Sequence, residues 1–146
     1  MREALQEAQN AQALNEVPVG AVLWDSGSGQ ILGRGYNQCI SAQDPTAHAE
    51  ILALREAGTT RGNYRLQNTV LVVTLEPCLM CLGALVQARI AGLVYGARDP
   101  KAGAVLSSID TLDFAWLYNK FWIVENVLEP ECKALLRDFF HPKRNI

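Results

Sequence analysis

The sequence predicts an α/β domain in which a mixed sheet of about five strands lies between layers of helices. Two observations predict this class. β-Prone runs alternate with segments of helical periodicity after an opening hairpin, and a continuous Val/Leu run at 69–75 is typical of a buried central strand. The chain has 146 residues, 49% of them hydrophobic and 19% charged, which is enough for one globular core. We therefore expect residues 1–146 to form a single domain.

The first half of the chain predicts a helix, a hairpin and a second helix. Apolar residues recur at helical spacing before Pro18, and the glycines of Asp25–Gly29 form a turn between two β-prone runs. Gly58 is expected to end the second helix. The expected elements are a helix over 2–14, strands over 19–24 and 31–37, and a helix over 46–57.

The second half alternates strands and helices around one irregular loop. Pro77 suits the first turn of a helix, where its missing N–H has no partner to lose, and Pro142 is expected to stop the last helix. The expected elements are a strand over 69–75, a helix over about 78–88, a strand over 93–96, a loop over 97–112, a strand over 121–124 and a helix over 130–140.

Composition excludes several classes of protein. The longest uncharged apolar stretches, 68–75 and 77–88, are shorter than the roughly 18 residues of a membrane span. The N-terminus is acidic and amphipathic, without the apolar core of a secretory signal or the Arg-rich composition of a transit peptide, so we expect a cytoplasmic protein with no membrane partner. Four cysteines are too few for a disulfide scaffold.

The net charge of −2 argues against a general nucleic-acid coat protein, yet three segments are locally basic. Residues 55–65, 89–101 and 131–146 each carry a net charge of +2. These segments are either a solvated mixed surface or parts of a site for an anionic partner.

Two short motifs carry the chemistry: His48-Ala-Glu50 and Pro77-Cys78-Leu-Met-Cys81. One imidazole and two thiols are three zinc ligands, and zinc with three protein ligands keeps a fourth position for water, as catalytic sites do. A helix N-terminus at Cys78 would stabilise both thiolates. His48 and Glu50 can approach one ion only where a helix begins, which predicts a helix start near Ala47 and a proton-shuttle role for Glu50.

Three other interpretations remain open on the residues alone. Cys78 and Cys81 also fit a redox-active dithiol. A structural zinc site would need a fourth ligand, and His48 alone could be an ordinary core histidine. Candidates for that fourth ligand are Cys39, Cys132 and His141. The coincidence of His-x-Glu with Pro-Cys-x-x-Cys favours catalytic zinc.

His-x-Glu followed by Pro-Cys-x-x-Cys is the signature of zinc nucleobase deaminases. The chain resembles the bacterial, TadA-type tRNA adenosine deaminases of the cytidine deaminase-like superfamily over nearly all of its length. Four segments carry the resemblance: Glu16-Val-Pro-Val-Gly-Ala21, Gly35-Tyr-Asn37 leading to Asp44-Pro-Thr-Ala-His-Ala-Glu-Ile51, Thr74-Leu-Glu-Pro-Cys-Leu-Met-Cys-Leu-Gly-Ala84, and Gly96-Ala-Arg-Asp-Pro-Lys-Ala-Gly-Ala104. The last of these is the most discriminating.

The resemblance implies a three-layer α/β/α cytidine-deaminase-like fold and one zinc ion per chain on His48, Cys78 and Cys81. It implies hydrolytic deamination of adenosine to inosine at the wobble position of a tRNA anticodon. In that reaction a zinc-bound hydroxide attacks C6 of a flipped-out adenine, and Glu50 shuttles the protons.

The resemblance also implies residues that bind the substrate. Val19 and Asn37 would line the base pocket, although the residues alone fit a strand position and a turn amide. The implied RNA contacts are Asp99, Lys101, Phe140, Lys143 and Arg144. Family likeness further implies a homodimer, with the start of the Pro77 helix and the 89–101 segment as candidate surfaces. Core packing is the alternative role for Phe139 and Phe140.

Two features depart from the family pattern. The family continues Gly-Ala-Ala-Gly-Ser after the lysine of the last motif, whereas here Val105-Leu106-Ser107 follows Ala104, and Pro142 interrupts the C-terminal helix. Both departures touch the expected RNA contacts and leave the zinc ligands alone. The alternatives are a free-base or nucleotide deaminase acting on guanine or cytosine and, in a different class, a zinc-stabilised RNA-binding module.

Overall fold

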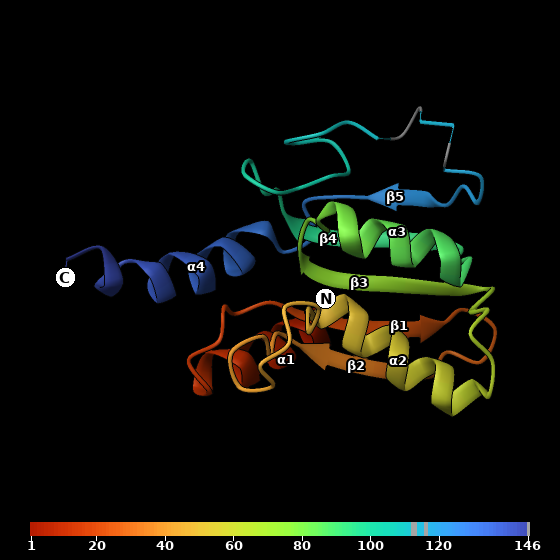
Figure 1. The fold of residues 1–146 in the computed structure, drawn as a ribbon, viewed down its shortest axis with the longest axis horizontal. Coiled ribbons are helices and arrows are strands. Elements are labelled where there is room, and N and C mark those ends of the chain that lie inside the picture. The colour runs from red at the N-terminus through yellow and green to blue at the C-terminus, as the bar shows by residue number, and fades with distance from the viewer. Residues whose placement is uncertain (112–113, 116, 146) are drawn as a thin grey trace.

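The computed structural model describes residues 1–111, 114–115 and 117–145. Its centre is a five-stranded sheet in the order β2-β1-β3-β4-β5 (Figure 1). β1 pairs antiparallel with β2 and β3, whereas β3, β4 and β5 run parallel, so the predicted mixed sheet is confirmed. The strands are β1 (Gly20–Asp25), β2 (Ile31–Tyr36), β3 (Thr69–Leu75), β4 (Gly92–Ala97) and β5 (Trp122–Val124).

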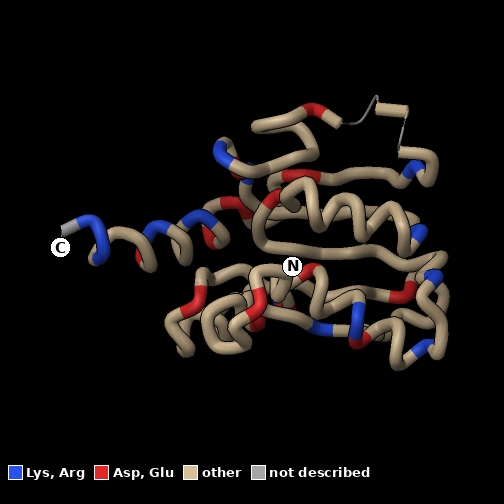
Figure 2. The backbone as a smooth tube through the Cα atoms, viewed as in Figure 1, with Lys and Arg blue, Asp and Glu red and all other residues tan. Residues whose placement is uncertain are grey.

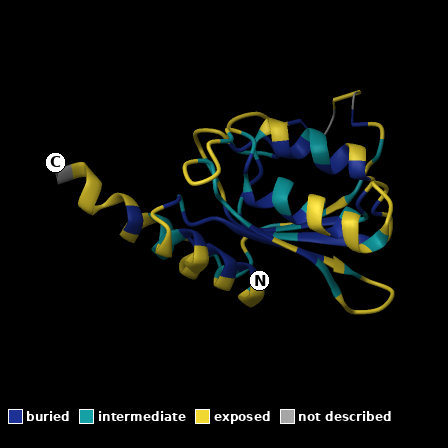
Figure 3. Ribbon diagram, turned by 60° about the horizontal axis from the view of Figure 1, so that its bottom comes forward, coloured by how far each residue is buried: buried dark blue, intermediate teal, exposed yellow. Residues whose placement is uncertain are grey.

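Helices cover both faces of this sheet (Figures 1 and 3). One face carries α2 (Ala49–Arg61) and α3 (Leu79–Ala88), and the other carries α1 (Arg2–Ala13) and α4 (Glu129–Phe140), which a 3₁₀ turn over Pro142–Asn145 follows. The three-layer α/β/α arrangement is therefore confirmed. Across the described residues, every helix is too short or too polar to cross a membrane.

Small residues let α2 lie very close to the sheet. A Cβ atom added at Gly33 would come within 2.2 Å of the Ala53 carbonyl oxygen, and one at Gly35 within 2.2 Å of the Ala49 carbonyl oxygen. Any side chain at these two positions of β2 would push the helix away. The N-terminus of α2 is thereby held at a fixed height above the end of the sheet.

The core lies around the two central strands. Leu71 and Val73 of β3 and Leu93 and Tyr95 of β4 are fully buried, and the apolar side chains of α3 pack against them. A strand that is buried on both faces reads as a continuous apolar run, which is why the limits of β3 agree with those expected from the sequence. Because β3 leads directly into the Glu76-Pro77 turn, the core also fixes the start of α3.

The second helix differs from the sequence prediction at both ends. It begins at Ala49, three residues beyond the first residue of the expected 46–57 helix and two beyond the expected start near Ala47. The reason is that His48 donates its backbone N–H to the Thr46 carbonyl in a turn and takes the N-cap position. It passes through Gly58 and ends at Arg61, where Gly62 with a φ of 69° is the cap. One glycine inside a helix costs only about 1 kcal/mol, which tertiary packing outweighs.

The other expected elements lie within two residues of their observed limits. The expected loop after β4 contains no helix or strand over 98–111, and residue 112 of that expectation lies outside the described residues.

Candidate active site

The N-termini of α2 and α3 bring the His48 and Cys78-Cys81 motifs together at one end of the sheet (Figure 1). His48 is the N-cap residue of α2 and Cys78 the N-cap residue of α3, while Cys81 lies in the first turn of α3. The free N–H groups and the positive dipole ends of two helices therefore face this site. The predicted meeting of the two motifs at helix starts is what the structure shows.

The spacing of the three donor atoms fits zinc. Nδ1 of His48 lies 3.6 Å from Sγ of Cys78 and 3.4 Å from Sγ of Cys81. In a tetrahedral site with Zn–N of about 2.0 Å and Zn–S of about 2.3 Å, nitrogen and sulfur ligands are about 3.5 Å apart. The three side chains are thus already at ligand distance from one another.

Within the described residues, this is the one group of three or more such side chains that could hold a metal ion. Neither Cys39, Cys132 nor His141 belongs to it. A fourth protein ligand is therefore missing from the described part of the chain, and a three-ligand set is the arrangement of a catalytic rather than a structural zinc site.

The two thiols are electrostatically unequal. The Cys81 thiol donates a hydrogen bond to Cys78, and this bond, with a smaller effect from His48, lowers the pKa of Cys78 to about 4. The same hydrogen bond, together with burial, raises the pKa of Cys81. The hydrogen bond with Cys78 also raises the pKa of His48. Thiolate character at a helix N-terminus is the state that binds a metal ion.

Glu50 lies beside these ligands at the second residue of α2. Only 4% of its surface is exposed, and its carboxyl group interacts with the Cys81 side chain. Burial raises the pKa of Glu50 to about 7. A carboxyl group with such a pKa can both accept and donate a proton near neutral pH, as a proton shuttle must.

Asn37 and Val19 lie next to each other at the edge of this site. The Asn37 side-chain oxygen accepts the backbone N–H of Ala49 at 2.9 Å, and the Asn37 backbone N–H donates to the Val19 carbonyl at 3.1 Å. Because Ala49 N–H can only donate, the Asn37 oxygen must face it and the NH₂ group points away from the helix. Asn37 therefore caps the first turn of α2 and still offers two N–H donors.

Asp99 and Lys101 lie on the loop that follows β4. The Asp99 carboxylate accepts the backbone N–H groups of Lys101 at 3.0 Å and Ala102 at 3.2 Å, so it shapes its own loop. Lys101 is exposed. Arg98, which precedes them in the same basic segment, makes a two-point ion pair with Glu125, with nitrogen–oxygen distances of 2.7 and 3.0 Å.

The other three expected RNA contacts lie at and just after the end of α4, which extends past the sheet (Figure 1). Phe140 is the last residue of α4, and Lys143 and Arg144 lie in the 3₁₀ turn that follows. Phe139 is 9% exposed and lies under the Lys143 ammonium group, which is 3.6 Å from its ring centroid. Phe140 is 41% exposed, and Lys143 and Arg144 are exposed. Of the two phenylalanines, Phe139 is therefore the packed residue and Phe140 the available one.

The three basic segments do not form one surface. Figure 2 shows Lys and Arg positions along α4 and on the loop after β4, and a separate group where α2 ends, at the opposite end of the sheet from the start of α2. In that second group Arg61 pairs with Asp25 at 3.4 Å. Of the three basic segments, only those around residues 101 and 143 lie toward the end of the sheet that holds the metal-site motifs.

Sequence reasoning missed two buried carboxylates, Glu16 and Glu76, which are each 2% exposed. Glu16 accepts the backbone N–H groups of Ile40 and Ser41, at 3.2 and 2.6 Å, in the loop that leads to His48. The Glu76 carboxylate accepts several backbone N–H groups of the loop after β4. For Glu76 the detectable sign in the sequence is an acidic residue in an otherwise apolar motif directly before Pro77.

Comparisons with known proteins agree with this geometry. Residues 1–97 match the sequence model of the cytidine and deoxycytidylate deaminase zinc-binding region. Over 144 residues, which are 99% of this chain and 83% of the relative, the sequence is 47% identical to a tRNA-specific adenosine deaminase of Haemophilus influenzae. The chain belongs to the tRNA-specific adenosine deaminase family.

Solved structures extend the comparison to the fold. A structure from a study of A-to-I editing by tRNA:A34 deaminases superposes with a TM-score of 0.89 at 40% identity, covering 93% of this chain and 97% of that one. A guanine deaminase of Bacillus subtilis superposes with a TM-score of 0.65 at 29% identity, covering 99% and 91%. Membership of the tRNA-specific adenosine deaminase family thus explains why the chain has the cytidine-deaminase-like fold.

Proposed function

We propose that this chain is a zinc-dependent enzyme that hydrolytically deaminates adenosine to inosine at the wobble position of a tRNA anticodon. One observation carries the proposal: in a chain of this family, His48, Cys78 and Cys81 lie within 4.8 Å of one another with Glu50 buried beside them. Those three side chains would hold one zinc ion per chain. When bound, zinc supplies an acidified water as the nucleophile.

Glu50 performs the proton transfers. It accepts a proton from the attacking water as the new C–O bond forms at C6 of adenine, and it delivers that proton to N1 of the ring. The second proton of that water, which remains on the oxygen now bonded to C6, passes through Glu50 to the amino group. The amino group leaves as ammonia when the C–N bond breaks and the C6 carbonyl forms. Adenosine and water thus become inosine and ammonia.

Asn37 and Val19 bind the base. The two N–H donors of Asn37 face away from α2, and they can hydrogen-bond to acceptors on a base that is turned out of its strand. Val19 is buried beside Asn37 and offers an apolar wall. The donor direction at Asn37 is fixed by the helix it caps, so the base would meet a preset hydrogen-bonding group.

The RNA partner is the anticodon stem-loop, which residues outside the metal site hold. Lys101, Lys143 and Arg144 are exposed cations that can neutralise phosphates, and exposed Phe140 can stack on a base. Asp99 acts here through the shape it gives its loop. All of these groups lie in one proposed deaminase domain of residues 1–146. A tRNA substrate places the enzyme in the cytoplasm.

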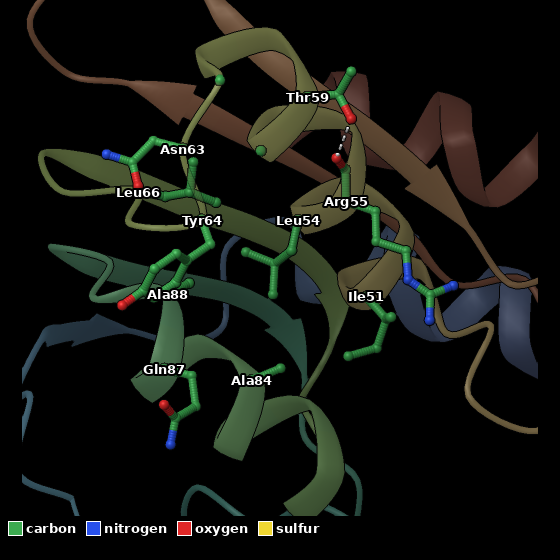
Figure 4. A pocket seen from close by; sticks show the side chains of 12 residues that line it. Ile51, Leu54, Arg55, Thr59, Asn63, Tyr64, Leu66, Ala84, Gln87 and Ala88 are labelled. Carbon is green, nitrogen blue, oxygen red and sulfur yellow. Dashed lines mark hydrogen bonds between the residues drawn. The ribbon is translucent and has the colours of Figure 1, made fainter.

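We further propose that the chain works as a homodimer, joined through the face that α2 and α3 present. A groove of about 760 Å³ runs between these helices, and in Figure 4 Ile51 and Leu54 face Ala84 of α3 across it. Leu79 and Met80, at the start of α3, are 49% and 37% exposed beside the same helix pair. A standard interface needs about 800 Å² per partner, roughly a tenth of the 7659 Å² surface of the chain.

Light scattering at micromolar concentration tests the homodimer. It should give twice the 16.0 kDa chain mass, and a strict monomer would contradict this proposal.

The guanine deaminase structure noted above supports one alternative, a free-base deaminase with the same metal ligands. A zinc-stabilised RNA-binding module is a weaker alternative, since such a module needs no buried carboxyl group at position 50. The test is to incubate purified zinc-loaded protein with an anticodon stem-loop and, separately, with free guanine, cytosine and adenine. Inosine and ammonia from the stem-loop support the proposal. Product from a free base alone supports the alternative, and the Glu50→Gln variant controls for a contaminating activity.

A further inference from the structure

Glu76 connects the metal-site motif to the loop after β4. Its Oε1 atom accepts the backbone N–H groups of Val105 at 3.1 Å, Leu106 at 2.7 Å and Ser107 at 2.9 Å. Its Oε2 atom accepts the backbone N–H of Asp99 at 3.0 Å and the Ser107 hydroxyl. Five donors from a single loop thus converge on one buried carboxylate. No ion pair of the described residues involves Glu76, so these donors are what stabilises its charge.

The loop is built around that carboxylate. A Cβ atom added at Gly103 would come within 2.6 Å of Oε2 and 2.5 Å of the carboxyl carbon of Glu76, so only glycine allows the backbone to wrap this closely. Ala104 adds a backbone hydrogen bond to the Pro77 carbonyl at 2.9 Å. The loop is therefore tied to two consecutive residues, 76 and 77, that directly precede the zinc ligand Cys78.

This arrangement explains how the loop tolerates its departure from the family pattern. Leu106 stands where the family has glycine, yet its contact with Glu76 uses the backbone N–H, which any residue except proline supplies. The Leu106 side chain packs partly against the core. The path of the loop is thus determined by Glu76 rather than by the side chain at 106.

We propose that Glu76 is a positioning residue for RNA. Its carboxylate holds the 99–107 loop, which carries the exposed Lys101, at a fixed place relative to Cys78, so that the loop is preformed to receive the substrate strand. This inference rests on the proposed function. Without that anchor the loop would have to be ordered when RNA binds, at a cost in affinity. The reacting groups would keep their geometry, because α3 is fixed by the core and not by the loop.

Glu76→Gln is the sharpest variant, since it keeps the size of the side chain but turns one oxygen into an NH₂ group that faces N–H donors. We expect wild-type zinc content, faster amide hydrogen exchange in peptides covering 98–108, and a KM for the anticodon stem-loop about tenfold higher with kcat per zinc within about threefold. Ser107→Ala removes one donor and leaves the carboxylate, and it should raise KM only about two- to threefold. If Glu76→Gln does not fold, the KM of Ser107→Ala for the stem-loop still tests the inference.

Glu16→Gln is the matched control, because Glu16 is likewise a buried carboxylate that accepts backbone N–H groups, and it lies outside the metal site. It should speed exchange around residues 40–41 and leave peptides covering 98–108 unchanged. Loss of zinc in Glu76→Gln would overturn the inference, since Glu76 would then serve the metal site. A loosened loop with unchanged KM would overturn it too. If the wild-type protein does not deaminate the stem-loop, the proposed function itself fails. That outcome is seen with the wild-type protein alone and is therefore distinct from failure of this inference.

Discussion

The metal-site group of His48, Cys78 and Cys81 lies at the starts of helices that pack against buried strands. The C-terminal group of Phe140, Lys143 and Arg144 lies instead at the end of α4 and in the 3₁₀ turn after it, where the chain extends past the sheet (Figure 3). The first group is positioned before any ligand arrives, because close packing above β2 and beside β3 leaves its backbone no freedom. The second group is exposed and has few neighbours of its own chain. The proposed catalytic groups are thus positioned by the core of this fold, and the proposed RNA contacts lie on its periphery.

This contrast predicts separable effects. Substitutions at the metal centre should change the rate of turnover and leave RNA affinity nearly intact. Substitutions at the end of α4 and in the turn after it should weaken RNA affinity and leave the rate of turnover nearly intact. The loop over 99–107 should show an intermediate effect, because Glu76 holds its backbone next to the metal-site motif while the loop carries the proposed RNA contact Lys101.

The largest expected effect is loss of the metal. Purified protein should contain close to one zinc per chain, and Cys81→Ala should lose both the zinc and all measurable turnover, since two ligands hold zinc far less tightly than three. Metal analysis of the wild-type and variant proteins checks this. A metal-free wild-type protein with a titratable Cys78–Cys81 disulfide would contradict it and favour the redox interpretation.

Next in size is removal of the proton shuttle. Glu50→Gln should keep the zinc, the fold and stem-loop affinity but lose turnover by roughly 10³-fold, because general acid–base catalysis is worth about 10²–10⁴-fold and Glu50 serves several proton transfers. Single-turnover kinetics per bound zinc provide the measurement. A variant that lost zinc yet stayed active per metal would show that Glu50 is a ligand.

Sequence reasoning succeeded where local pattern decides the outcome. The Val/Leu run gave the limits of β3, and the spacing of His48 and Cys78-Cys81 predicted a group that the structure brings together. Motifs of this kind are readable because the residue types themselves carry the chemistry.

The missed features depend on partners that are distant in the sequence. Glu76 accepts N–H groups that are 23 to 31 residues away, and Arg98 pairs with Glu125 across 27 residues, so their local sequence does not reveal which partners they have. Backbone N–H groups occur in every sequence and leave no pattern. The end of α2 was misjudged for a related reason, because packing against β2 overrides the local preference of Gly58.

The recognition surface is tested by neutralising its charges. Lys143→Gln combined with Arg144→Gln should weaken stem-loop binding and flatten the dependence of log K on log salt concentration, by roughly 0.7 for each single-strand phosphate that the variant no longer neutralises. Turnover at saturating RNA should fall much less, because the metal centre lies elsewhere. Arg98→Gln is a useful comparison, since Glu125 already pairs with that guanidinium and the salt slope should change little. Unchanged affinity and slope in the double variant would mean that these charges are only a solvated face.

The smallest expected effect concerns pH and the loop that leads to His48. Burial opposes ionisation of Glu16, but the N–H groups of Ser41 and Ile40 outweigh it and hold the pKa of Glu16 below its ordinary value of 4.5. A carboxyl group whose pKa is lowered by folding stabilises the folded state above its unfolded-state pKa, and this contribution is lost as pH falls through the folded-state value. Glu16→Gln should therefore cost about 2 kcal/mol of unfolding free energy at pH 7, and the difference from wild type should shrink below pH 4.5. Urea titrations at several pH values measure that difference. Amide hydrogen exchange in α4 should be unaffected by the variant, because the loop that leads to His48 and the C-terminal helix belong to separate regions. A difference in unfolding free energy that stayed constant down to pH 3 would show that Glu16 acts by its shape and not by its charge.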